Sequence, residues 1–423
     1  MQRDNNIPKG YKPSPLGPIP IDWEVMELKT LVEKVGSGIT PTGGEKVYKN
    51  EGRVFLRSQN VGWGTLLLDD VAFIDEQTHQ SFKSTELEFE DVLLNITGAS
   101  IGRSSIADMR IVGGNVNQHV CIIRPNRKYL SPYFLNAFIL SQKGQNLIDS
   151  CQAGGNRQGL NFEQIKSFRI PVPPLKEQTA IANLLSTWDK SINTLTQLIA
   201  QKELRKKWLM QQLLTGKKKL KGFKGEWREV RLSELFERVT RKNTEANTNV
   251  VTISAQKGFI KQEDFFNKIV ASEITDNYFL VQRGEFCYNK SYSNGYPWGA
   301  TKRLNDFDKA VVTTLYICFG IKDEDETFGD FFEQYFEAGL LDRGLMKIAH
   351  EGGRAHGLLN VTPSDFFDLI ISIPDFEEQT AIATLLQTAD AELNLFRQKL
   401  DKLKEQKKGL MQVLLTGKKR LKF

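Results

Sequence analysis

Cysteine and histidine are scarce in this chain, which limits the metal and redox chemistry open to it. Four cysteines and four histidines occur among 423 residues. Cys121, Cys151, Cys287 and Cys318 form no C-x-x-C pair, and none of them forms a zinc-motif spacing with a histidine. This spacing excludes the common zinc motifs and a disulfide framework, and it favours buried thiols in a reducing compartment.

Long apolar runs are missing as well. The sequence has no stretch of 18 apolar residues, and its first residues lack the charged and apolar segments of a signal peptide. A membrane-spanning helix needs an apolar run of about that length. We therefore expect a cytoplasmic protein without a membrane span.

The sequence contains none of the catalytic motifs that its length would accommodate. It has no G-x-x-x-x-G-K-[ST] loop for an ATPase, no [ND]-P-P-Y motif and no glycine-rich S-adenosylmethionine loop for a methyltransferase. The one Pro-Asp pair, Pro374-Asp375, leads into a helix rather than a strand, which is a poor nuclease signal. The histidines lack the spacing of metal ligands. We expect no catalytic residue, no metal site and no cofactor in this chain.

Composition sets wide bounds on what remains. A chain of 423 residues has room for two or three domains, and 40% hydrophobic residues suffice for sizeable cores. The net charge is +6 and the sequence pI is about 8.9. This mild basic excess is compatible with binding nucleic acid but does not require it.

A 45-residue stretch occurs twice and organises the chain. Residues 177–221 and 378–422 align without a gap at an offset of 201, and 25 of the 45 positions are identical. In both copies apolar residues recur in alternating steps of four and three, which is typical of a coiled coil. Proline precedes each copy and glycine (Gly216, Gly417) follows it, as expected at helix boundaries. The repeat predicts two helices, each roughly 50–60 Å long at 1.5 Å per residue.

The two predicted helices should pair with each other, because each needs a partner for its apolar stripe. If a pseudo-two-fold relates the two halves, the helices run antiparallel and facing residue numbers sum to 595. This register places Lys407 opposite Trp188 and Lys206 opposite Ala389. A lysine over an indole ring would make a favourable cation–π contact.

A globular region of about 150 residues precedes each helix, and the second repeats the order of the first with a diverged sequence. A helix is expected near Leu31 and another over residues 131–148. The predicted fold is α+β, with two similar α/β domains separated by two long helices that form an antiparallel coiled coil. The predicted segments are a Pro-rich arm (1–22), a first domain (23–172), a central helix (173–222), a second domain (223–374) and a C-terminal helix (375–423).

Loops of both domains carry polar and aromatic residues suited to base edges and phosphates. Arginine and lysine pair with guanine, asparagine and glutamine pair with adenine, and glycine-rich turns allow close approach to phosphate. Each residue alone is a weak signal, because such side chains are usually solvated. The set gains weight because it recurs at matching places in both domains. The predicted DNA-binding residues of the first domain are Arg57, Ser58, Gln59, Asn60, Trp63, Asn95, Thr97, Arg103, Asn117, Gln118, Asn156, Arg157 and Gln158. Those of the second domain are Gln256, Lys257, Asn289, Lys290, Tyr292, Tyr296, Trp298, Lys302, Arg354 and His356.

Several motifs resemble those of a known family. They are IPIDWEV (19–25), LRSQNV (56–61), the GGNR loop (154–157), IPVPPLKEQTAIANLL (170–185) and LLTGKKKLKGF (213–223). With the repeated helices, they resemble a type I restriction–modification specificity subunit over essentially the whole chain. The resemblance implies that each globular region is a target recognition domain reading one half of a bipartite DNA site. It also implies that the helices form the spacer.

The same resemblance implies partners that supply the chemistry. Two methyltransferase subunits that use S-adenosylmethionine would dock on the specificity subunit, and translocating nuclease subunits that use ATP and Mg²⁺ would complete the complex. Repeated helix positions facing outward would then form two equivalent docking surfaces. The predicted partner-binding residues are Gln178, Thr179, Gln211 and Thr215 in the first copy and Gln379, Thr380, Gln412 and Thr416 in the second.

Two other interpretations stay open at this point. The chain could be a coiled-coil adaptor that binds protein only, or an enzyme whose catalytic loop has no familiar motif. Salt-dependent binding to duplex DNA separates the first alternative from a specificity subunit. An assay of the isolated chain for methyl transfer or DNA cleavage separates the second.

Overall fold

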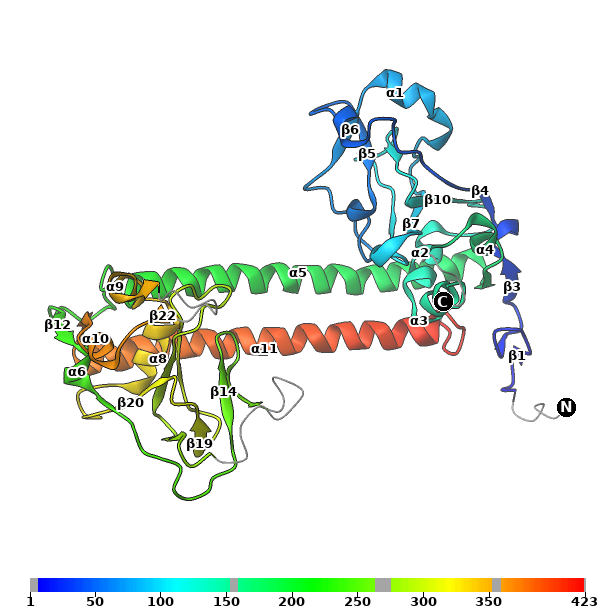
Figure 1. Cartoon of the computed structure of the whole chain (residues 1–423). Helices are drawn as coiled ribbons and strands as arrows, with labels where there is room; N and C mark the ends of the chain where they lie inside the picture. The colour runs from blue at the N-terminus through cyan, green and yellow to red at the C-terminus, as the bar shows by residue number, and fades with distance from the viewer. Residues whose placement is uncertain (1–6, 153–158, 263–274, 352–358, 422–423) are drawn as a thin grey trace. The chain divides into compact units, whose positions relative to one another are not determined.

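The computed structural model describes residues 7–152, 159–262, 275–351 and 359–421 (Figure 1). These residues form two compact units. Unit 1 comprises residues 1–196 with 398–423, and unit 2 comprises residues 197–397. Each unit therefore combines one globular domain with one half of each long helix. The five-segment division of the chain stays a prediction, since the compact units cut across both helices.

The domain of unit 1 is built on a four-stranded antiparallel sheet in the order β4-β10-β7-β8. A separate three-stranded sheet, β6-β5-β9, contains the parallel pair β5 and β9. The strands of this unit are β1 (Tyr11–Lys12), β2 (Ile19–Pro20), β3 (Glu24–Glu27), β4 (Val32–Ser37), β5 (Arg53–Leu56), β6 (Ala72–Ile74), β7 (Val92–Asn95), β8 (Ser104–Ile106), β9 (Asn115–Val116), β10 (Val120–Pro125) and β11 (Arg169–Val172). Its short α-helices are α1 (Glu76–Ser81), α2 (Pro132–Leu140), α3 (Gln142–Ser150) and α4 (Phe162–Lys166).

Unit 2 repeats this topology. Its four-stranded sheet has the order β13-β20-β17-β18, which matches the first sheet strand for strand. The strands are β12 (Arg228–Arg231), β13 (Phe236–Arg238), β14 (Val251–Ser254), β15 (Gly258–Lys261), β16 (Phe279–Gln282), β17 (Phe286–Asn289), β18 (Ala300–Arg303), β19 (Lys309–Val312), β20 (Ile317–Ile321), β21 (His350–Glu351), β22 (Leu359–Asn360) and β23 (Ile370–Ile373). Its short α-helices are α6 (Leu232–Leu235), α8 (Gly329–Glu337), α9 (Asp342–Ile348) and α10 (Pro363–Phe367).

Two details differ from the sequence prediction. The helix expected over 131–148 is two helices, α2 and α3, which meet at Ser141; its hydroxyl accepts a hydrogen bond from Gly144 N. A Cβ at Gly144 would lie 2.2 Å from the carbonyl oxygen of Phe138, so glycine is needed for the two helices to meet this closely. The helix expected near Leu31 is only a 3₁₀ turn, Leu28–Thr30, that leads directly into β4.

The long helices α5 (Leu175–Leu213) and α11 (Phe376–Leu414) run antiparallel. In unit 1 the Lys407 Nζ lies 2.5 Å from Asp189. In unit 2 the ion pairs Lys202–Glu392 and Lys206–Asp390 are both 2.5 Å long. Facing residue numbers in these pairs sum to 594 or 596, next to the predicted 595. The antiparallel coiled coil is therefore confirmed. The expected stacking of Lys407 on Trp188 is not found among the described residues, because its ammonium group pairs with the neighbouring Asp189 instead.

Both ends of each helix are buried in a domain core. In unit 1 the core holds the start of α5 and the end of α11, through Ile181, Leu185, Met411, Leu414 and Leu415. The core of unit 2 holds the corresponding residues 201 positions away, Ile382, Leu386, Met210, Leu213 and Leu214. Burying such a side chain contributes roughly 1.5–3 kcal/mol. Most of the repeated apolar positions are thus explained by packing within the chain.

The repeated glycine after each helix has a local cause. Gly216 and Gly417 have φ angles of 68° and 69°, in the left-handed region that ends a helix. A Cβ at Gly216 would lie 3.2 Å from the indole ring of Trp227, and one at Gly417 would lie 3.2 Å from that of Trp23. Each helix end therefore packs against the tryptophan that opens a domain.

No helix of the described residues is long and apolar enough to cross a membrane.

The seam should carry much of the stability of the helix pair. We expect Leu393→Ala to lower the free energy of unfolding by about 2–5 kcal/mol, because Leu393 is 4% exposed and its loss leaves a cavity. Leu195→Ala should act in the same way, and Leu400→Asp should be worse. The matched control is Leu395→Ala on the same helix, where the side chain is 66% exposed. Equal losses for Leu393→Ala and Leu395→Ala in denaturant unfolding would contradict this assignment of the seam.

Candidate nucleic-acid interface and docking surfaces

The predicted DNA-binding residues of the first domain that the structure describes, Arg57 to Gln118, lie at one end of its sheets. Strand β10 pairs antiparallel with both β4 and β7, so β10 begins where those two strands end. Strands β5 and β9 are parallel, and Asn117 N donates to Leu56 O at the ends of both. The loops after β4, β5, β7 and β9 therefore gather at one edge. This arrangement brings together residues that are up to 60 positions apart in the sequence.

Three of the predicted residues are buried in that edge and serve it structurally. Asn60 is 1% exposed, and its amide donates to Leu67 O and Asp70 O. Asn95 is fully buried and donates 2.8 Å to Ser58 O. Asn117 is 8% exposed, and its Oδ1 accepts from His119 N. The amides of Asn60 and Asn95 bind loop carbonyls, so these two residues are less available to DNA than the exposed residues of this edge.

Other side chains at this edge stay accessible. Gln59, Trp63 and Gln118 are exposed, whereas Arg57, Ser58, Thr97 and Arg103 are half-buried. The guanidinium of Arg57 lies 3.1 Å from Asp70 and over the ring of Tyr48. Arg57 is therefore oriented, and partly neutralised, before any ligand arrives.

Trp63 is held at the tip of a braced hairpin. Val61 and Leu66 form an antiparallel bridge, and Gly62 N donates to Thr65 O at 2.9 Å. The hydroxyl of Ser105 in β8 donates to Thr65 O at 2.6 Å. Even so, the indole ring of Trp63 is 58% exposed. An indole fixed in solvent by a rigid turn is suited to stacking on a flat partner such as a base.

A polar chain that the sequence analysis missed connects the loops at this edge. His119 Nδ1 lies 2.6 Å from Thr97 Oγ1, and its Nε2 lies 2.9 Å from Gln118 Nε2. The hydroxyl of Thr40 donates to Gln118 Oε1. Thr97 also bridges to Gly159, the first described residue after the Gly-Gly loop. Asn156, Arg157 and Gln158 lie outside the described residues. The sequence could have indicated His119 as a member of this chain, because it is adjacent to the predicted residue Gln118. Nothing in the sequence indicated Thr40.

In the second domain, Gln256, Lys257, Asn289 and Lys290 lie at or next to the equivalent strand ends. Gln256 and Lys257 are exposed in the turn between β14 and β15. Asn289 ends β17, and Lys290 follows it; burial lowers the pKa of the Lys290 ammonium group. The carbonyl of Lys290 accepts from Leu359 N, as Ile96 O accepts from Leu160 N in the first domain. Tyr292 is 65% exposed. Arg354 and His356 lie outside the described residues.

Tyr296 and Lys302 are already engaged with helix α8. Tyr296 donates to Glu337 at 2.7 Å, and Lys302 forms an ion pair with the same carboxylate. Burial raises the pKa of the Tyr296 phenol. Trp298 is half-buried and packs on the core of unit 2. These three side chains therefore stabilise the domain. They are less available to DNA than those of Gln256, Lys257 and Tyr292.

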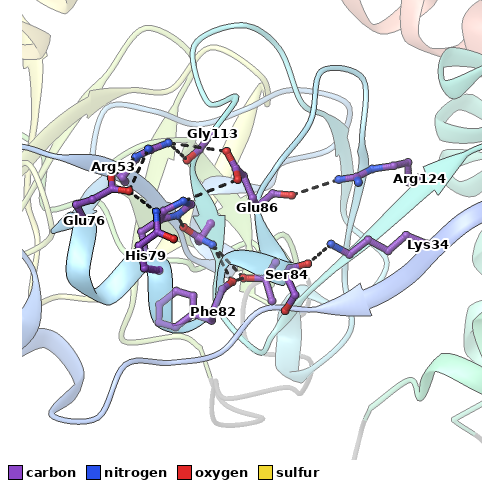
Figure 2. Close-up of polar contacts among 12 residues, drawn as sticks. Lys34, Arg53, Glu76, His79, Phe82, Ser84, Glu86, Gly113 and Arg124 are labelled. Carbon is purple, nitrogen blue, oxygen red and sulfur yellow. Dashed lines mark hydrogen bonds and ion pairs between the residues drawn. The ribbon is translucent and has the colours of Figure 1, made fainter.

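A separate polar network closes the opposite end of the first domain (Figure 2). His79 is 1% exposed, and its Nδ1 lies 2.7 Å from Asn115 Oδ1. Arg53 binds Glu76 at 2.9 Å, and Arg124 binds Asp91 at 2.8 Å. These residues lie where β5 and β7 begin and β10 ends, away from the candidate interface. The buried members of this network, His79, Asn115 and Asp91, are paired and so stabilise this end of the domain. The described residues hold no cluster of three His, Cys, Asp or Glu that would bind a metal ion.

Two of the predicted partner-binding residues are buried, so the prediction that they face outward is wrong. Gln178 and Gln379 are fully buried near the starts of α5 and α11. Gln178 accepts from Ser131 N at 2.8 Å and donates to the carbonyls of Tyr129 and Pro173. Gln379 makes the equivalent three bonds to Phe328 N, Glu326 O and Pro374 O. The repeated glutamine is therefore explained by attachment of each helix to its own domain.

The repeated glutamate before each glutamine has the same kind of role. Trp23 Nε1 donates to Glu177 at 3.0 Å, and Trp227 Nε1 donates to Glu378 at 3.2 Å. The two sites differ in their cation. Arg420 binds Glu177 at 2.6 Å and Asp22 at 2.8 Å, and its guanidinium lowers the pKa of Asp22.

At the second site Lys219 stands where Arg420 would align, and it donates to Gly225 O instead. One oxygen of Glu378 has no hydrogen-bond partner within the described chain, and burial raises the pKa of this carboxyl. The two copies therefore have the same secondary structure at this site but different charge pairing: Glu177 has a cationic partner in Arg420, whereas Glu378 has no equivalent ion pair.

The remaining predicted docking positions keep the environment expected of them, with one exception. Thr179, Gln211, Thr215 and Gln412 are exposed and Thr380 is half-buried, whereas Thr416 is 6% exposed. Each threonine hydroxyl donates to the carbonyl four residues earlier, such as Thr215 to Gln211 O. The side chains of Gln211 and Gln412 have no partner among the described residues, which leaves them free to bind another chain.

The two glutamine types should separate in a stability measurement. Gln178→Ala should lower the free energy of unfolding by about 2–4 kcal/mol, because it leaves a buried N–H and two buried carbonyls unpaired. Gln211→Ala should change it by less than about 0.5 kcal/mol, as is usual for an exposed position. Chemical denaturation of both variants checks the difference. A neutral Gln178→Ala would contradict its structural role.

The two glutamates should respond in opposite directions to loss of charge. Glu177→Gln should destabilise the protein at neutral pH by about 1–3 kcal/mol, because it removes the charge of the buried one of the two carboxylates that Arg420 binds. Glu378→Gln should be neutral or stabilising there, because the pKa of the Glu378 carboxyl is raised in the folded state. A raised carboxyl pKa means that stability is lost as the pH rises from the ordinary value of 4.5 through the folded-state value.

Thermal unfolding between pH 4 and pH 8 distinguishes the two variants. The stability of wild type relative to Glu378→Gln should fall over the lower part of this range, as Glu378 ionises in wild type. An identical pH profile for wild type and Glu378→Gln would count against the assignment.

Comparison with known proteins identifies the fold and the family. The family model described as "Type I restriction modification DNA specificity domain" matches residues 20–204 and again residues 224–405. A putative type I restriction enzyme MjaX specificity subunit of Methanocaldococcus jannaschii is 26% identical over 98% of this chain and 97% of that protein.

Two solved structures share the fold. The type I restriction-modification system S subunit from M. genitalium aligns with a TM-score of 0.55 and 14% identity, over 98% of both chains. A chain from a study of complex assembly and conformational transition of the type I R-M system aligns with a TM-score of 0.58 and 17% identity, over 94% of this chain and 99% of that one.

The two domain matches cover most of the sequence and fall on the two halves of the internal repeat. The chain belongs to the family of DNA specificity subunits of type I restriction-modification systems. This family is non-catalytic, which agrees with the sequence prediction that the chain is not an enzyme.

Proposed function

We propose that each domain of this chain reads one half of a bipartite DNA site, and that the helix pair sets the gap and docks two methyltransferase subunits. Nuclease and translocase subunits would complete the restriction complex. S-adenosylmethionine, ATP and Mg²⁺ would bind to those partners. The relative whose structure concerns assembly of the type I R-M system supports a multi-subunit role of this kind.

One observation carries the reading function. Exposed polar and aromatic side chains gather at the same strand ends in both domains, although the two domain sequences have diverged. Gln59, Trp63 and Gln118 do so in the first domain, and Gln256, Lys257 and Tyr292 in the second. Amides and an ammonium group supply hydrogen bonds to base edges, and the aromatic rings supply stacking. Because these sets differ in chemistry, the two half-sites should differ and the target should be asymmetric.

The spacer role follows from the length of the helices. Each has 39 residues. At 1.5 Å per residue such a rod is about 58 Å long, so it holds two readers apart by at most about 58 Å, which corresponds to roughly 17 base pairs. The half-sites should therefore straddle an uncontacted gap of several base pairs.

A protein-only adaptor is the alternative, and DNA binding by the chain separates the two. A specificity subunit should bind duplex DNA with an affinity that falls as salt increases, because phosphate contacts release counterions. An adaptor should show no such binding at any salt concentration.

Exchange of one domain should change one half of the target only. Residues 227–374 would be replaced by the same region of a relative with a different target, and the methylated motif would be read by methylome sequencing of cells. The second half-site should change and the first should stay the same, because each domain has its own core and its own interface. The matched control is the reciprocal exchange of residues 23–172. An exchange that altered both halves of the motif would contradict independent reading.

A further inference from the structure

A second stripe on α5, outside the seam, has features of a binding face. Gln201, Leu204, Trp208, Gln211 and Thr215 follow one another in steps of three and four and are all exposed. Leu204 is 69% exposed and Trp208 is 47% exposed. A run of this spacing with apolar members is typical of a helix that packs against another helix. We call these five residues the outer stripe of α5.

The outer stripe is distinct from the face that pairs with α11. The paired face of this helix segment carries Lys202 and Lys206, which bind Glu392 and Asp390. Within unit 2, the Nζ of Lys218 lies 4.8 Å from the centre of the Trp208 ring. This contact orients the indole ring and leaves it exposed. Less side-chain conformational entropy is therefore lost when a partner binds Trp208.

The corresponding stripe on α11 lacks the apolar pair. Positions 201 residues later are Lys402, Glu405, Gly409, Gln412 and Thr416. The glutamine and threonine are therefore repeated, whereas leucine and tryptophan are replaced by glutamate and glycine. Tryptophan is enriched among the residues that dominate interface energy, and leucine adds apolar area that a partner can bury. Glutamate and glycine provide no such anchor.

The repeated glutamines point to the same occupant on both stripes. Gln211 and Gln412 have exposed side chains without a partner in the described chain, so folding of this protein does not account for their repetition. The flank of the α5 stripe is basic, since Arg205, Lys207 and Lys217 are exposed beside it. A partner that fits this surface presents a helix with an apolar face and an acidic rim.

We propose that the two methyltransferase docking surfaces are unequal, and that the α5 stripe binds its methyltransferase subunit first and more tightly because of Leu204 and Trp208. This inference rests on the proposed function, because it takes the methyltransferase subunit as the occupant. Assembly is then stepwise: a complex with one methyltransferase forms at low concentration, and the second subunit adds at higher concentration.

Native mass spectrometry of the full chain, titrated with the methyltransferase subunit of its own system, tests the proposal. Wild type should show a one-to-one complex before the two-to-one complex, with dissociation constants at least about tenfold apart. The double variant Leu204→Glu/Trp208→Gly gives α5 the residues of α11 and should bring the two constants together by weakening the first. Because glycine weakens a helix, thermal unfolding of this variant is measured alongside.

The reciprocal variant Glu405→Leu/Gly409→Trp is the matched test on α11. Its expected effect is an increase in affinity, so a misfolded variant could not mimic it. It should tighten the second site about tenfold and leave the first unchanged. Equal dissociation constants in wild type, or no tightening in the reciprocal variant, would overturn the inequality and leave the proposed function intact. Absence of any methyltransferase complex would instead overturn the proposed function. Concentration-dependent self-association that Leu204→Glu/Trp208→Gly abolishes would overturn the assigned occupant, because a second copy of this chain would then cover the stripe.

Discussion

The antiparallel pairing of α5 and α11 is the constraint on which the rest of the structure depends. It places the end of one helix copy beside the start of the other, and each such pair of ends completes one domain core. Leu185 and Leu414 meet in the core of unit 1, and Leu386 and Leu213 meet in that of unit 2. A domain therefore lacks part of its core until both helices are in place, so the coiled coil is a structural part of each domain as well as a connection.

The same pairing explains why the repeat is conserved at its ends and varied in its middle. At the ends, Gln178 and Gln379 attach the helices to their domains, and Gly216 and Gly417 make room for a tryptophan ring. In the middle, a position needs only to fill the seam or to remain solvated. The two ends are nevertheless not identical, since Arg420 pairs with Glu177 whereas Glu378 has a carboxylate oxygen without a partner. At the helix ends, the ion pairing with this glutamate is consequently stronger in unit 1 than in unit 2.

The candidate interface follows from strand topology more than from any motif. Antiparallel pairing of β10 with β4 and β7 collects three loops at one edge, and the parallel pair β5–β9 adds a fourth. The asparagines of these loops point inward and form hydrogen bonds with backbone groups. Gln59, Trp63 and Gln118 are exposed at the same edge. A rigid frame of buried amides beneath a small exposed set favours reading by fixed side chains over reading by a flexible loop.

The sequence by itself predicted the repeat, the two long helices, their antiparallel direction and the family. It also predicted the register of the seam, since facing residue numbers sum to 594 or 596 against the expected 595. Heptad periodicity depends on neighbours three or four positions away, and gap-free identity is read by aligning the two copies, so both are properties of the linear chain. Which polar residue is exposed depends on groups far away in the sequence, so only the tertiary structure decided it. Asn95 and Gln59 are both polar loop residues, yet the amide of Asn95 is buried and donates to Ser58 O, whereas Gln59 is exposed. Gln178 is likewise expected on an outer helix face from the sequence, but its amide donates to the carbonyls of Tyr129 and Pro173. A buried amide and an exposed amide have the same sequence signal, because the difference lies in which distant backbone groups need a hydrogen-bond partner.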